Sequence, residues 1–284
     1  MKQELKKTIG IIGGTGKMGS WFSKFFSRKG YKVQVSGRTT SLSIRDCAKT
    51  SDIVIVSVPI GQTISIIREI APLVKEDGLL MDFTSIKQAP IEAMLAHSRS
   101  AVIGLHPMFG AGVKALKNQT IVICPARPRN YLPWIRDLLV KDGGIIKIIT
   151  PEQHDRMMAV IQGLLHFSSI SICHSLRKLG TPMSEMEKLS SPIFRLSMDV
   201  VGRILNQDGN LYADIELLNP FVVETLKTYI TDAQSLLAMI EQKDKAAFLA
   251  YFDEAADYLG NFKKESEYYT DSVIEFLVDK GRRR

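Results

Sequence analysis

The stretch Ile9-Gly10-Ile11-Ile12-Gly13-Gly14-Thr15-Gly16-Lys17-Met18-Gly19 decides the fold of the first half of the chain. It places a G-x-G-x-x-G pattern, formed by Gly14, Gly16 and Gly19, between an apolar strand-like run and a helix-like segment. In dinucleotide-binding turns the first glycine makes the tight turn, the second admits a pyrophosphate, and the third lets helix and strand pack closely. The pattern alone is weak evidence, but this context predicts a nucleotide-binding turn.

Strand-like and helix-like segments alternate as far as residue 149. Apolar, β-branched runs predict seven strands, at 8–12, 31–35, 53–58, 79–84, 101–105, 120–124 and 145–149. Helical spacing predicts helices at 21–29, 63–74, 90–97 and 131–141. Alternation of this kind is typical of a parallel sheet with helices on both faces. We expect residues 1–149 to form a Rossmann-like α/β dinucleotide-binding domain.

Residues 150–284 contain no convincing strand and predict an all-helical domain. Thr150-Pro151 and Asn219-Pro220 each combine a helix cap with a proline at the first helical position, and breaks are expected at 180–182 and 208–209. The first of these helices has apolar residues on more than one face, namely Val160, Leu164, Leu165, Phe167, Ile170 and Ile172. We expect a second copy of the chain to cover them, which makes this the dimerisation domain of a homodimer.

Composition excludes several classes of protein. The net charge is +7, but residues 2–7 carry a net +2 and residues 279–284 a net +3, so no basic stripe for nucleic acid is visible. No apolar stretch approaches the ~20 residues of a membrane span. The cysteines, Cys47, Cys124 and Cys173, are far apart and form no CxxC. We expect a cytoplasmic protein without a metal site that binds neither nucleic acid nor membranes.

The end of the second predicted strand bears on the choice of cofactor. NAD sites usually offer a carboxylate about 20 residues past the glycines, but Ser36-Gly37-Arg38-Thr39-Thr40 contains none. A guanidinium among hydroxyls suits a 2′-phosphate, so NADP is favoured over NAD. The alternative is a plain turn with a solvated Arg38. The residues that we expect to bind the cofactor are Gly14, Thr15, Gly16, Lys17, Met18, Gly19, Ser36, Arg38, Thr39, Ser57 and Pro59.

His106 is the best candidate for a catalytic base. It directly follows the predicted strand 101–105, and open α/β sheets bind substrates beyond the carboxyl ends of their strands. A neutral imidazole there can accept a hydroxyl proton while hydride leaves the same carbon. The alternative is a loop histidine hydrogen-bonded to the backbone. For His97, His154 and His174, in polar helical contexts, we expect surface positions.

Two further pairs of polar residues share helix faces. Gln162 and His166 are four residues apart among apolar neighbours, so they either pair with each other or point into a site. Arg195 and Arg203 are eight residues apart on one predicted helix, nearly on one face. Such arginines suit a dicarboxylate, whereas salt bridges to Glu185, Glu187 or Asp199 are the alternative.

Motifs along nearly the whole chain resemble those of the prephenate dehydrogenase family. They are Gly13-Gly14-Thr15-Gly16-Lys17-Met18-Gly19, Val56-Ser57-Val58-Pro59-Ile60, Asp82-Phe83-Thr84-Ser85-Ile86-Lys87, Leu105-His106-Pro107-Met108-Phe109-Gly110, Glu152-Gln153-His154-Asp155, Leu189-Ser190-Ser191-Pro192-Ile193-Phe194-Arg195-Leu196 and Leu211-Tyr212-Ala213-Asp214-Ile215. The resemblance is strongest to the dehydrogenase part of the bifunctional chorismate mutase–prephenate dehydrogenases. Only seven residues precede the first predicted strand, so we expect no mutase activity.

The resemblance implies oxidative decarboxylation of prephenate to 4-hydroxyphenylpyruvate, a step of tyrosine biosynthesis, with hydride transfer to NAD or NADP. It implies that His106 is catalytic and that Ser85 lies beside the reacting hydroxyl. It further implies substrate-binding roles for Gln162, His166 and Arg203, and with a looser match for Lys87 and Arg195. In the family the helical domain forms the dimer.

Two alternatives to prephenate dehydrogenation remain open at the level of sequence. A related dehydrogenase that acts on arogenate or on a β-hydroxy acid would keep the fold and change the pocket. A non-catalytic module that senses NADP would need only the nucleotide site. The set of Ser85, His106 and Arg203 argues against the second alternative.

Overall fold

The computed structural model describes residues 7–281, which divide into two compact units. One unit runs to Gln162 and includes Asn210–Val222, and the other comprises Gly163–Gly209 and the chain from Val223 onward. The division falls inside a continuous helical segment, and a later stretch of chain returns to the first unit. The N-terminal nucleotide-binding α/β domain and the helical C-terminal half that we expected are both present.

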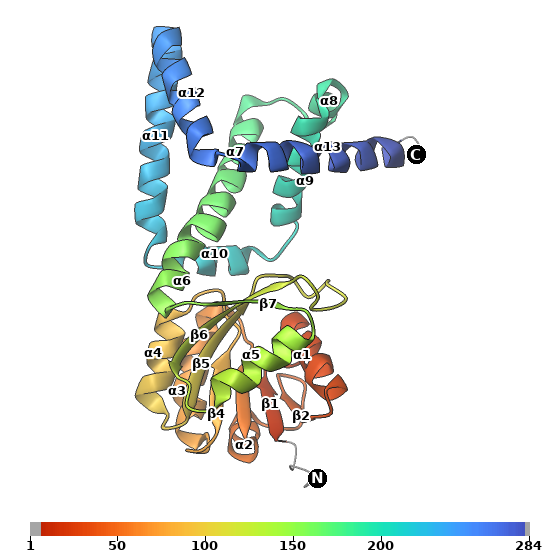
Figure 1. The fold of residues 1–284 in the computed structure, drawn as a ribbon, viewed down its shortest axis with the longest axis vertical. Helices are drawn as coiled ribbons and strands as arrows, with labels where there is room; N and C mark the ends of the chain where they lie inside the picture. The colour runs from red at the N-terminus through yellow and green to blue at the C-terminus, as the bar shows by residue number, and fades with distance from the viewer. Residues whose placement is uncertain (1–6, 282–284) are drawn as a thin grey trace. The chain divides into compact units, whose positions relative to one another are not determined.

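The first unit is built on one seven-stranded sheet with the order β2-β1-β3-β4-β5-β6-β7 (Figure 1). Its strands are β1 (Thr8–Ile12), β2 (Lys32–Ser36), β3 (Ile53–Val56), β4 (Leu79–Asp82), β5 (Ala101–Pro107), β6 (Thr120–Arg127) and β7 (Ile145–Ile148). The expectation of a wholly parallel sheet is wrong, because β6 runs antiparallel to β5. A parallel return requires a crossover, usually a helix, and none lies between these two strands.

Helices cover both faces of this sheet. The helices are α1 (Lys17–Arg28), α2 (Ile44–Thr50), α3 (Ile60–Ile70), α4 (Gln88–His97) and α5 (Tyr131–Lys141). The apolar side chains of α1 and α5 pack on one face, and those of α2, α3 and α4 pack on the other. Helix α2 was not expected from the sequence. It is capped by Ser43, whose hydroxyl accepts a hydrogen bond from the Asp46 N–H at 3.0 Å.

The central strands are apolar at successive positions because both of their faces are buried. Ile9 and Ile11 of β1 join a core cluster with Phe22, Phe25 and Phe26 of α1. On the other face of the sheet, Val54 and Val56 of β3 join a second core cluster with Ile67 and Ile70 of α3. Burying each such side chain contributes about 1.5–3 kcal/mol, which holds the ends of the strands in fixed positions.

Three further segments complete the first unit. Helix α6 (Pro151–Met158) is followed by a π-helical segment (Ala159–Leu164), and α10 (Gly209–Leu218) returns later in the chain. Thr150 and Gln153 form a reciprocal capping box at the start of α6. The Gly61 N–H, in the first turn of α3, donates to Asp214 Oδ2 at 2.8 Å, which attaches α10 to the nucleotide-binding unit.

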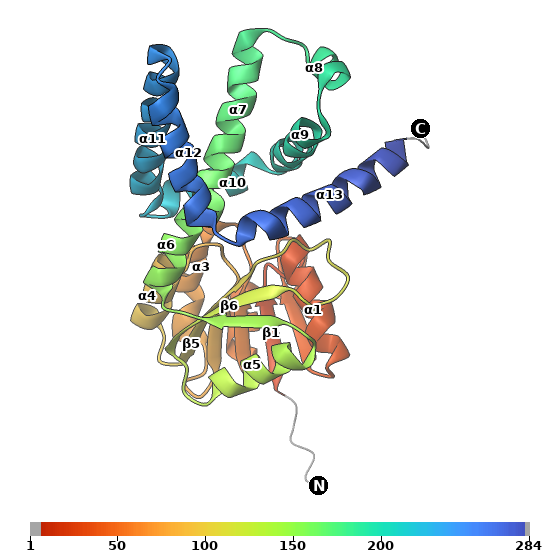
Figure 2. The same ribbon diagram turned by 45° about the horizontal axis from the view of Figure 1, so that its top comes forward.

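The second unit is entirely helical within the described residues. It contains α7 (Leu165–Leu179), α8 (Met183–Leu189), α9 (Pro192–Leu205), α11 (Val222–Gln242), α12 (Lys245–Leu259) and α13 (Phe262–Gly281). Helices α11 and α12 lie side by side in Figures 1 and 2, joined by a turn at Lys243 and Asp244. Many of its large apolar side chains are exposed, including Leu179 at 76%, Leu189 at 90% and Tyr258 at 90%.

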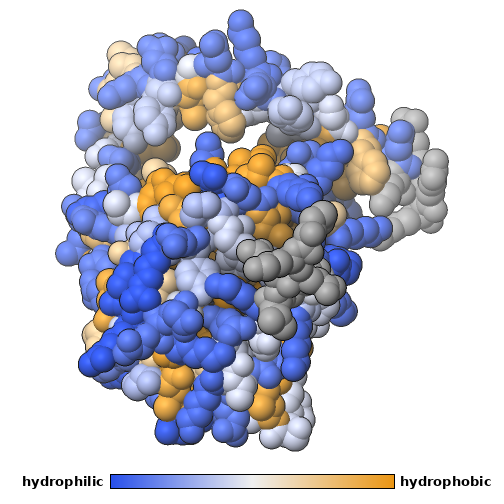
Figure 3. Space-filling view, turned by 60° about the horizontal axis from the view of Figure 1, so that its bottom comes forward, coloured by the Kyte–Doolittle hydropathy of each residue, from blue (hydrophilic) through white to orange (hydrophobic). Residues whose placement is uncertain are grey.

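The continuous helical segment Pro151–Leu179 is long and apolar enough to cross a membrane, judged by length and composition only. No such segment was expected from the sequence, because polar residues such as His154 and Gln162 interrupt its apolar run. One such helix is weak evidence for a membrane span, since helices of soluble proteins pass the same test. Hydrophilic residues cover most of the face drawn in Figure 3, with separate apolar patches between them.

The charged ends of the chain, residues 2–7 and 279–284, lie largely outside the described residues. Lys7 is described, and its ammonium is not free in solvent. It donates to the Tyr131 hydroxyl at 2.8 Å and lies 4.1 Å from the centre of that ring.

Candidate active site

The glycine-rich turn brings the backbone of α1 close to β1 and β3. Gly13 has a φ of +80°, and a Cβ there would lie 2.2 Å from the Ser57 carbonyl oxygen, so the left-handed residue is Gly13 and not Gly14. A Cβ on Gly19 would lie 2.5 Å from the Gly13 carbonyl oxygen. The N–H groups of Gly13 and Gly14 both donate to the Ser36 carbonyl. Only glycine fits at these close approaches, and the turn leaves the start of α1 open.

A pocket of about 400 Å³ lies at this turn. Its lining residues are Ile12, Gly13, Thr15, Gly16, Gly37, Arg38, Ile44, Ser57, Val58, Pro59, Gln62 and Ile66. Five expected cofactor residues line it, namely Thr15, Gly16, Arg38, Ser57 and Pro59. Gly14, Lys17, Met18, Gly19, Ser36 and Thr39 are not among the lining residues. The pocket combines backbone N–H groups, one guanidinium and apolar walls, which suits a dinucleotide.

The end of β2 forms a turn that uses some of its hydroxyls internally. The Ser36 hydroxyl is buried and donates to the Leu42 carbonyl at 2.7 Å. The Thr40 hydroxyl accepts from the Gly37 N–H at 2.8 Å. Arg38 and Thr39 remain exposed. Arg38 is therefore the residue of this turn that can meet a charged group in the pocket.

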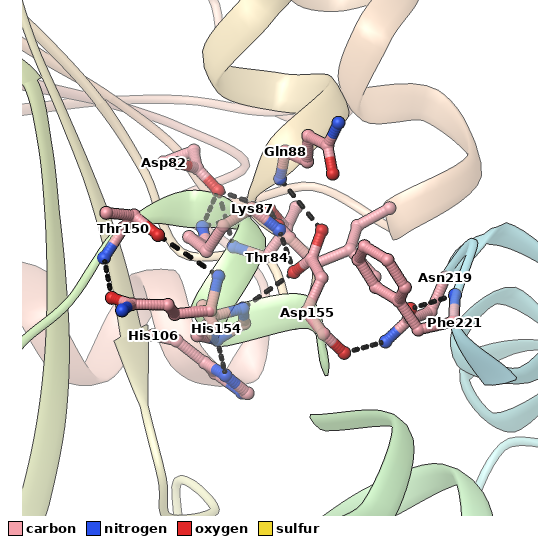
Figure 4. Close-up of polar contacts among 12 residues, drawn as sticks. Asp82, Thr84, Lys87, Gln88, His106, Thr150, His154, Asp155, Asn219 and Phe221 are labelled. Carbon is pink, nitrogen blue, oxygen red and sulfur yellow. Dashed lines mark hydrogen bonds and ion pairs between the residues drawn. The ribbon is translucent and has the colours of Figure 1, made fainter. Parts of the chain in front are cut away.

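His106 lies inside β5, and only 4% of it is exposed. Its Nδ1 is 2.8 Å from Nε2 of His154 (Figure 4). Burial, followed by the influence of His154 and Lys87, lowers the pKa of His106 well below its ordinary value of 6.5. The imidazole is consequently neutral at neutral pH, which is the state that a general base requires.

The position of His154 contradicts the expectation that this residue lies on the surface. His154 is fully buried, and its Nδ1 is 2.7 Å from Asp155 Oδ1. Burial lowers the pKa of His154, although the hydrogen bond to Asp155 opposes that shift. The buried residues of α6 are His154, Asp155 and Met158. His154 lies four residues before the apolar Met158 and hence on the same helix face, and this spacing was the signal in the sequence that His154 is buried.

A buried ion pair joins the end of β4 to the loop that follows it. The Lys87 ammonium donates to Asp82 Oδ2 and to the Thr84 hydroxyl, and neither charged side chain is exposed. Asp82 Oδ1 has no hydrogen-bond partner among the described residues. Ser85, which is half-buried, lies in the same loop. Lys87 therefore has its charge satisfied within the protein.

The remaining candidates occupy different environments. Oε1 of Gln162, in the π-helical segment, is buried without a hydrogen-bond partner in the described part of the chain. In the helical unit, His166 is 9% exposed, and burial lowers its pKa. Arg195 forms ion pairs with Glu187 at 2.7 Å and Asp199 at 3.1 Å, so the salt bridges that we gave as the alternative are present. Arg203 is exposed and has no ion pair within residues 7–281.

Within residues 7–281, no group of three or more His, Cys, Asp or Glu side chains is placed to hold a metal ion.

Two family models match the chain. The nucleotide-binding domain of prephenate dehydrogenase matches residues 22–148, and the prephenate dehydrogenase dimerisation domain matches residues 150–254.

Curated relatives match most of the chain. A probable arogenate/prephenate dehydrogenase of Methanocaldococcus jannaschii is 38% identical over 95% of this chain and 65% of its own length. The T-protein of Haemophilus influenzae is 35% identical over 90% of this chain and 68% of its own length. The chain thus spans about two thirds of the length of these relatives.

Solved structures share the fold. Prephenate dehydrogenase from Aquifex aeolicus, in complex with hydroxyphenyl propionate and NAD+, superimposes with a TM-score of 0.72 at 20% identity. That match covers 90% of this chain and 98% of the other. Arogenate dehydrogenase from Synechocystis gives a TM-score of 0.70 at 19% identity, over 92% of this chain and 99% of the other.

Proposed function

The chain belongs to the prephenate dehydrogenase family, and we propose that it catalyses the oxidative decarboxylation of prephenate to 4-hydroxyphenylpyruvate. Members of this family are oxidoreductases of aromatic amino acid biosynthesis with a nucleotide-binding Rossmann domain. The observation that carries the proposal is His106, a buried neutral imidazole at the end of a central strand. Its Nε2 has no hydrogen-bond partner among the described residues and can receive a substrate proton.

The reaction requires little of the protein beyond proton transfer and positioning. When bound, the dinucleotide supplies the hydride acceptor. His106 Nε2 accepts the proton of the ring hydroxyl as the C–H bond of the same carbon breaks, and a carbonyl forms. The ring carboxylate then leaves as CO₂, its bonding electrons pass through the ring to the carbonyl oxygen, and the ring becomes aromatic. Return of the proton from His106 to that oxygen balances the reaction.

The pocket at the glycine-rich turn fits the cofactor. The residues that we propose to hold it are the glycines and Thr15 of the turn, Lys17 and Met18 at the start of α1, Ser36, Arg38 and Thr39 at the end of β2, and Ser57 and Pro59 after β3. Because the turn after β2 offers a guanidinium and no carboxylate, we propose that NADP is preferred over NAD.

We propose that Ser85, Gln162, His166 and Arg203 bind the substrate, as the resemblance to the family implies. Arg203 is the better of the two arginines, since it has no internal ion pair within the described chain, whereas Arg195 has two. Lys87 remains a candidate for substrate binding only through the electrostatic field of its charge, because its ammonium is fully buried against Asp82.

We also propose a cytoplasmic homodimer formed through the helical unit. The match to a dimerisation domain over residues 150–254 and the many exposed apolar side chains of that unit support the dimer. Three free cysteines support a reducing compartment.

The proposal is tested by following the absorbance of the reduced cofactor with prephenate and with arogenate, each with NAD and NADP. We expect turnover of prephenate. Arogenate is the second candidate substrate, because the name of the 38% identical relative includes it. Failure of both substrates with both cofactors would favour a non-catalytic nucleotide sensor.

The first testable prediction concerns His106. His106→Asn should lower kcat by roughly 10²–10⁴, the usual contribution of a positioned general base, while NADP and prephenate still bind. Isothermal titration with the cofactor supplies the control for folding. Wild-type turnover in this variant would remove His106 from the mechanism.

A further inference from the structure

A chain of three buried side chains ends at His106. Asp155 Oδ1 is 2.7 Å from His154 Nδ1, and His154 Nε2 is 2.8 Å from His106 Nδ1 (Figure 4). The exposed fractions of Asp155, His154 and His106 are 1%, 0% and 4%. Water therefore cannot easily replace any of these hydrogen bonds, and each partner must match the next in donor and acceptor character.

The direction of the chain is set at Asp155. Its Oδ1 also accepts from the Lys87 N–H at 2.7 Å, and its Oδ2 accepts from the Gln88 N–H at 2.9 Å. These N–H groups belong to the start of α4, whose positive end favours a carboxylate. With both oxygens accepting, Asp155 offers no proton to His154. His154 Nδ1 is consequently the donor in their contact.

A neutral His154 then fixes the tautomer of its neighbour. With its single proton on Nδ1, its Nε2 carries a lone pair and accepts from His106 Nδ1–H. Burial lowers the pKa of both imidazoles, with Lys87 contributing in each case, so both are neutral at neutral pH. The only proton of His106 is thus on Nδ1, and its Nε2 is left with the lone pair.

We propose that His154 and Asp155 act as a positioning relay that holds His106 in the tautomer with an unprotonated Nε2. This inference deepens the proposed function, in which that nitrogen accepts the substrate hydroxyl proton. When His106 becomes an imidazolium, its Nδ1–H remains bonded to His154, and the Asp155 carboxylate at the far end stabilises the new charge. One proton moves, from the substrate oxygen to Nε2, and no proton transfer along the relay is required.

The charged groups around the relay are compatible with this direction. Asp82, at the end of β4, and Lys87, from the loop after it, neutralise each other in a buried ion pair. The ammonium is thereby kept from the imidazoles as a hydrogen-bond donor, although its field still opposes their protonation. Cys124 of β6, with its pKa raised to about 12 by burial, adds no charge.

Nuclear magnetic resonance of ring-¹⁵N-histidine tests the tautomer without any substrate. The chain has five histidines, which single variants can assign. In the wild type at neutral pH, we expect His106 to show a protonated Nδ1 and an unprotonated Nε2. In Asp155→Asn, the amide can donate to His154 Nδ1, so His154 Nε2–H should donate to His106 and move the proton of His106 to Nε2. A wild-type His106 protonated at Nε2 would overturn the relay.

Kinetics provide the second measurement. Asp155→Asn should lower kcat by ~10²–10⁴, with KM for the substrate and the cofactor Kd within about twofold, as expected when only the tautomer changes. His154→Phe keeps a ring in the buried space and removes both hydrogen bonds, and it should also lower kcat selectively. It replaces Asp155→Asn if that variant does not fold. His97→Asn, an exposed histidine of the same unit, is the matched control and should leave kcat unchanged.

The outcomes separate the relay from the proposed function. If neither prephenate nor arogenate is turned over, the proposed function fails, but the ring-nitrogen signals still decide whether the relay exists. If turnover occurs and a folded Asp155→Asn variant retains wild-type kcat with an unchanged His106 tautomer, the relay is wrong while the function stands.

Discussion

Arg203 and Arg195 show how neighbouring residues of one type can differ in chemistry. Both lie on α9, but the Arg195 guanidinium is occupied by Glu187 and Asp199. The carboxylates raise the pKa of Arg195, although it is exposed, and they compete with any substrate carboxylate. Arg203 has no such competitor in the described chain. Its charge is available to an anionic ligand.

Replacing each arginine tests this difference. Arg203→Ala should chiefly raise KM for prephenate, by ~2–5 kcal/mol in equivalent binding energy, because a substrate carboxylate loses its charged partner. Arg195→Ala, the matched control, should change KM little. Steady-state kinetics of both variants provide the measurement. Equal KM effects would show that the ion pairs of Arg195 do not distinguish the two residues.

Arg38 determines the choice of cofactor in our proposal. It is exposed and lines the nucleotide pocket, whereas the hydroxyls of Ser36 and Thr40 are already bonded within the turn. A guanidinium–phosphate contact contributes about 1.5–3 kcal/mol. Arg38→Ala should therefore erase a roughly tenfold to hundredfold preference for NADP in kcat/KM and leave activity with NAD nearly intact. A preference for NAD in the wild type, or one for NADP that survives the mutation, would contradict this.

At the scale of elements, α6 and α10 complete the nucleotide-binding unit although they follow the sheet in the chain. Helix α6 supplies His154 and Asp155, and the Asn219 amide, just after α10, donates to the Asp155 carbonyl at 2.8 Å. Asp214 of α10 accepts from the first turn of α3. The end of the sheet that carries His106 is thus held by helices from the other half of the sequence.

Glu216 of α10 makes the stability of this helix depend on pH. Burial raises the pKa of Glu216 from 4.5 to about 7. Since the folded pKa lies above the unfolded one, its stabilising contribution is full below pH 4.5 and is lost as pH rises through 7. Glu216→Gln, which resembles the protonated acid, should have a higher Tm than the wild type at pH 8 and a similar Tm at pH 4.5.

Melting curves between pH 4.5 and 8 check this prediction. Glu254→Gln, at an exposed position inside α12, is the control and should follow the wild type at every pH. If the Glu216→Gln and wild-type curves run parallel over the whole range, Glu216 does not titrate with a raised pKa.

At the scale of the whole molecule, the helical unit exposes many large apolar side chains. Its exposed side chains include Phe252 at 61%, Phe262 at 60% and Tyr268 at 69%. We expect a dimer that dilution does not readily separate, with twice the chain mass of 31.7 kDa. Light scattering over a dilution series measures this. A stable, active monomer would contradict it.

Local sequence patterns were enough to predict the order and type of most elements in the nucleotide-binding half. Helix α5 was predicted at its observed bounds, and the seven strands were found because apolar runs and glycine-rich turns are local patterns. The motifs also sufficed to identify the family. Residues such as Gly13 and Gly19 belong to these motifs because the backbone approaches them too closely for any other side chain. Helix α2 was not predicted because its apolar face is short.

The direction of β6 and the surroundings of the candidate site could not be predicted in this way, because both depend on contacts between distant parts of the chain. His106 and His154 are 48 residues apart, and Asp155 meets the Lys87 N–H across 68 residues. Periodicity indicates which face of an element is buried, but it does not indicate which residues contact that face. A histidine in a polar helical stretch therefore looked like a surface residue. Its hydrogen bonds, and with them the protonation state of His106, depend on contacts that exist only in the folded chain.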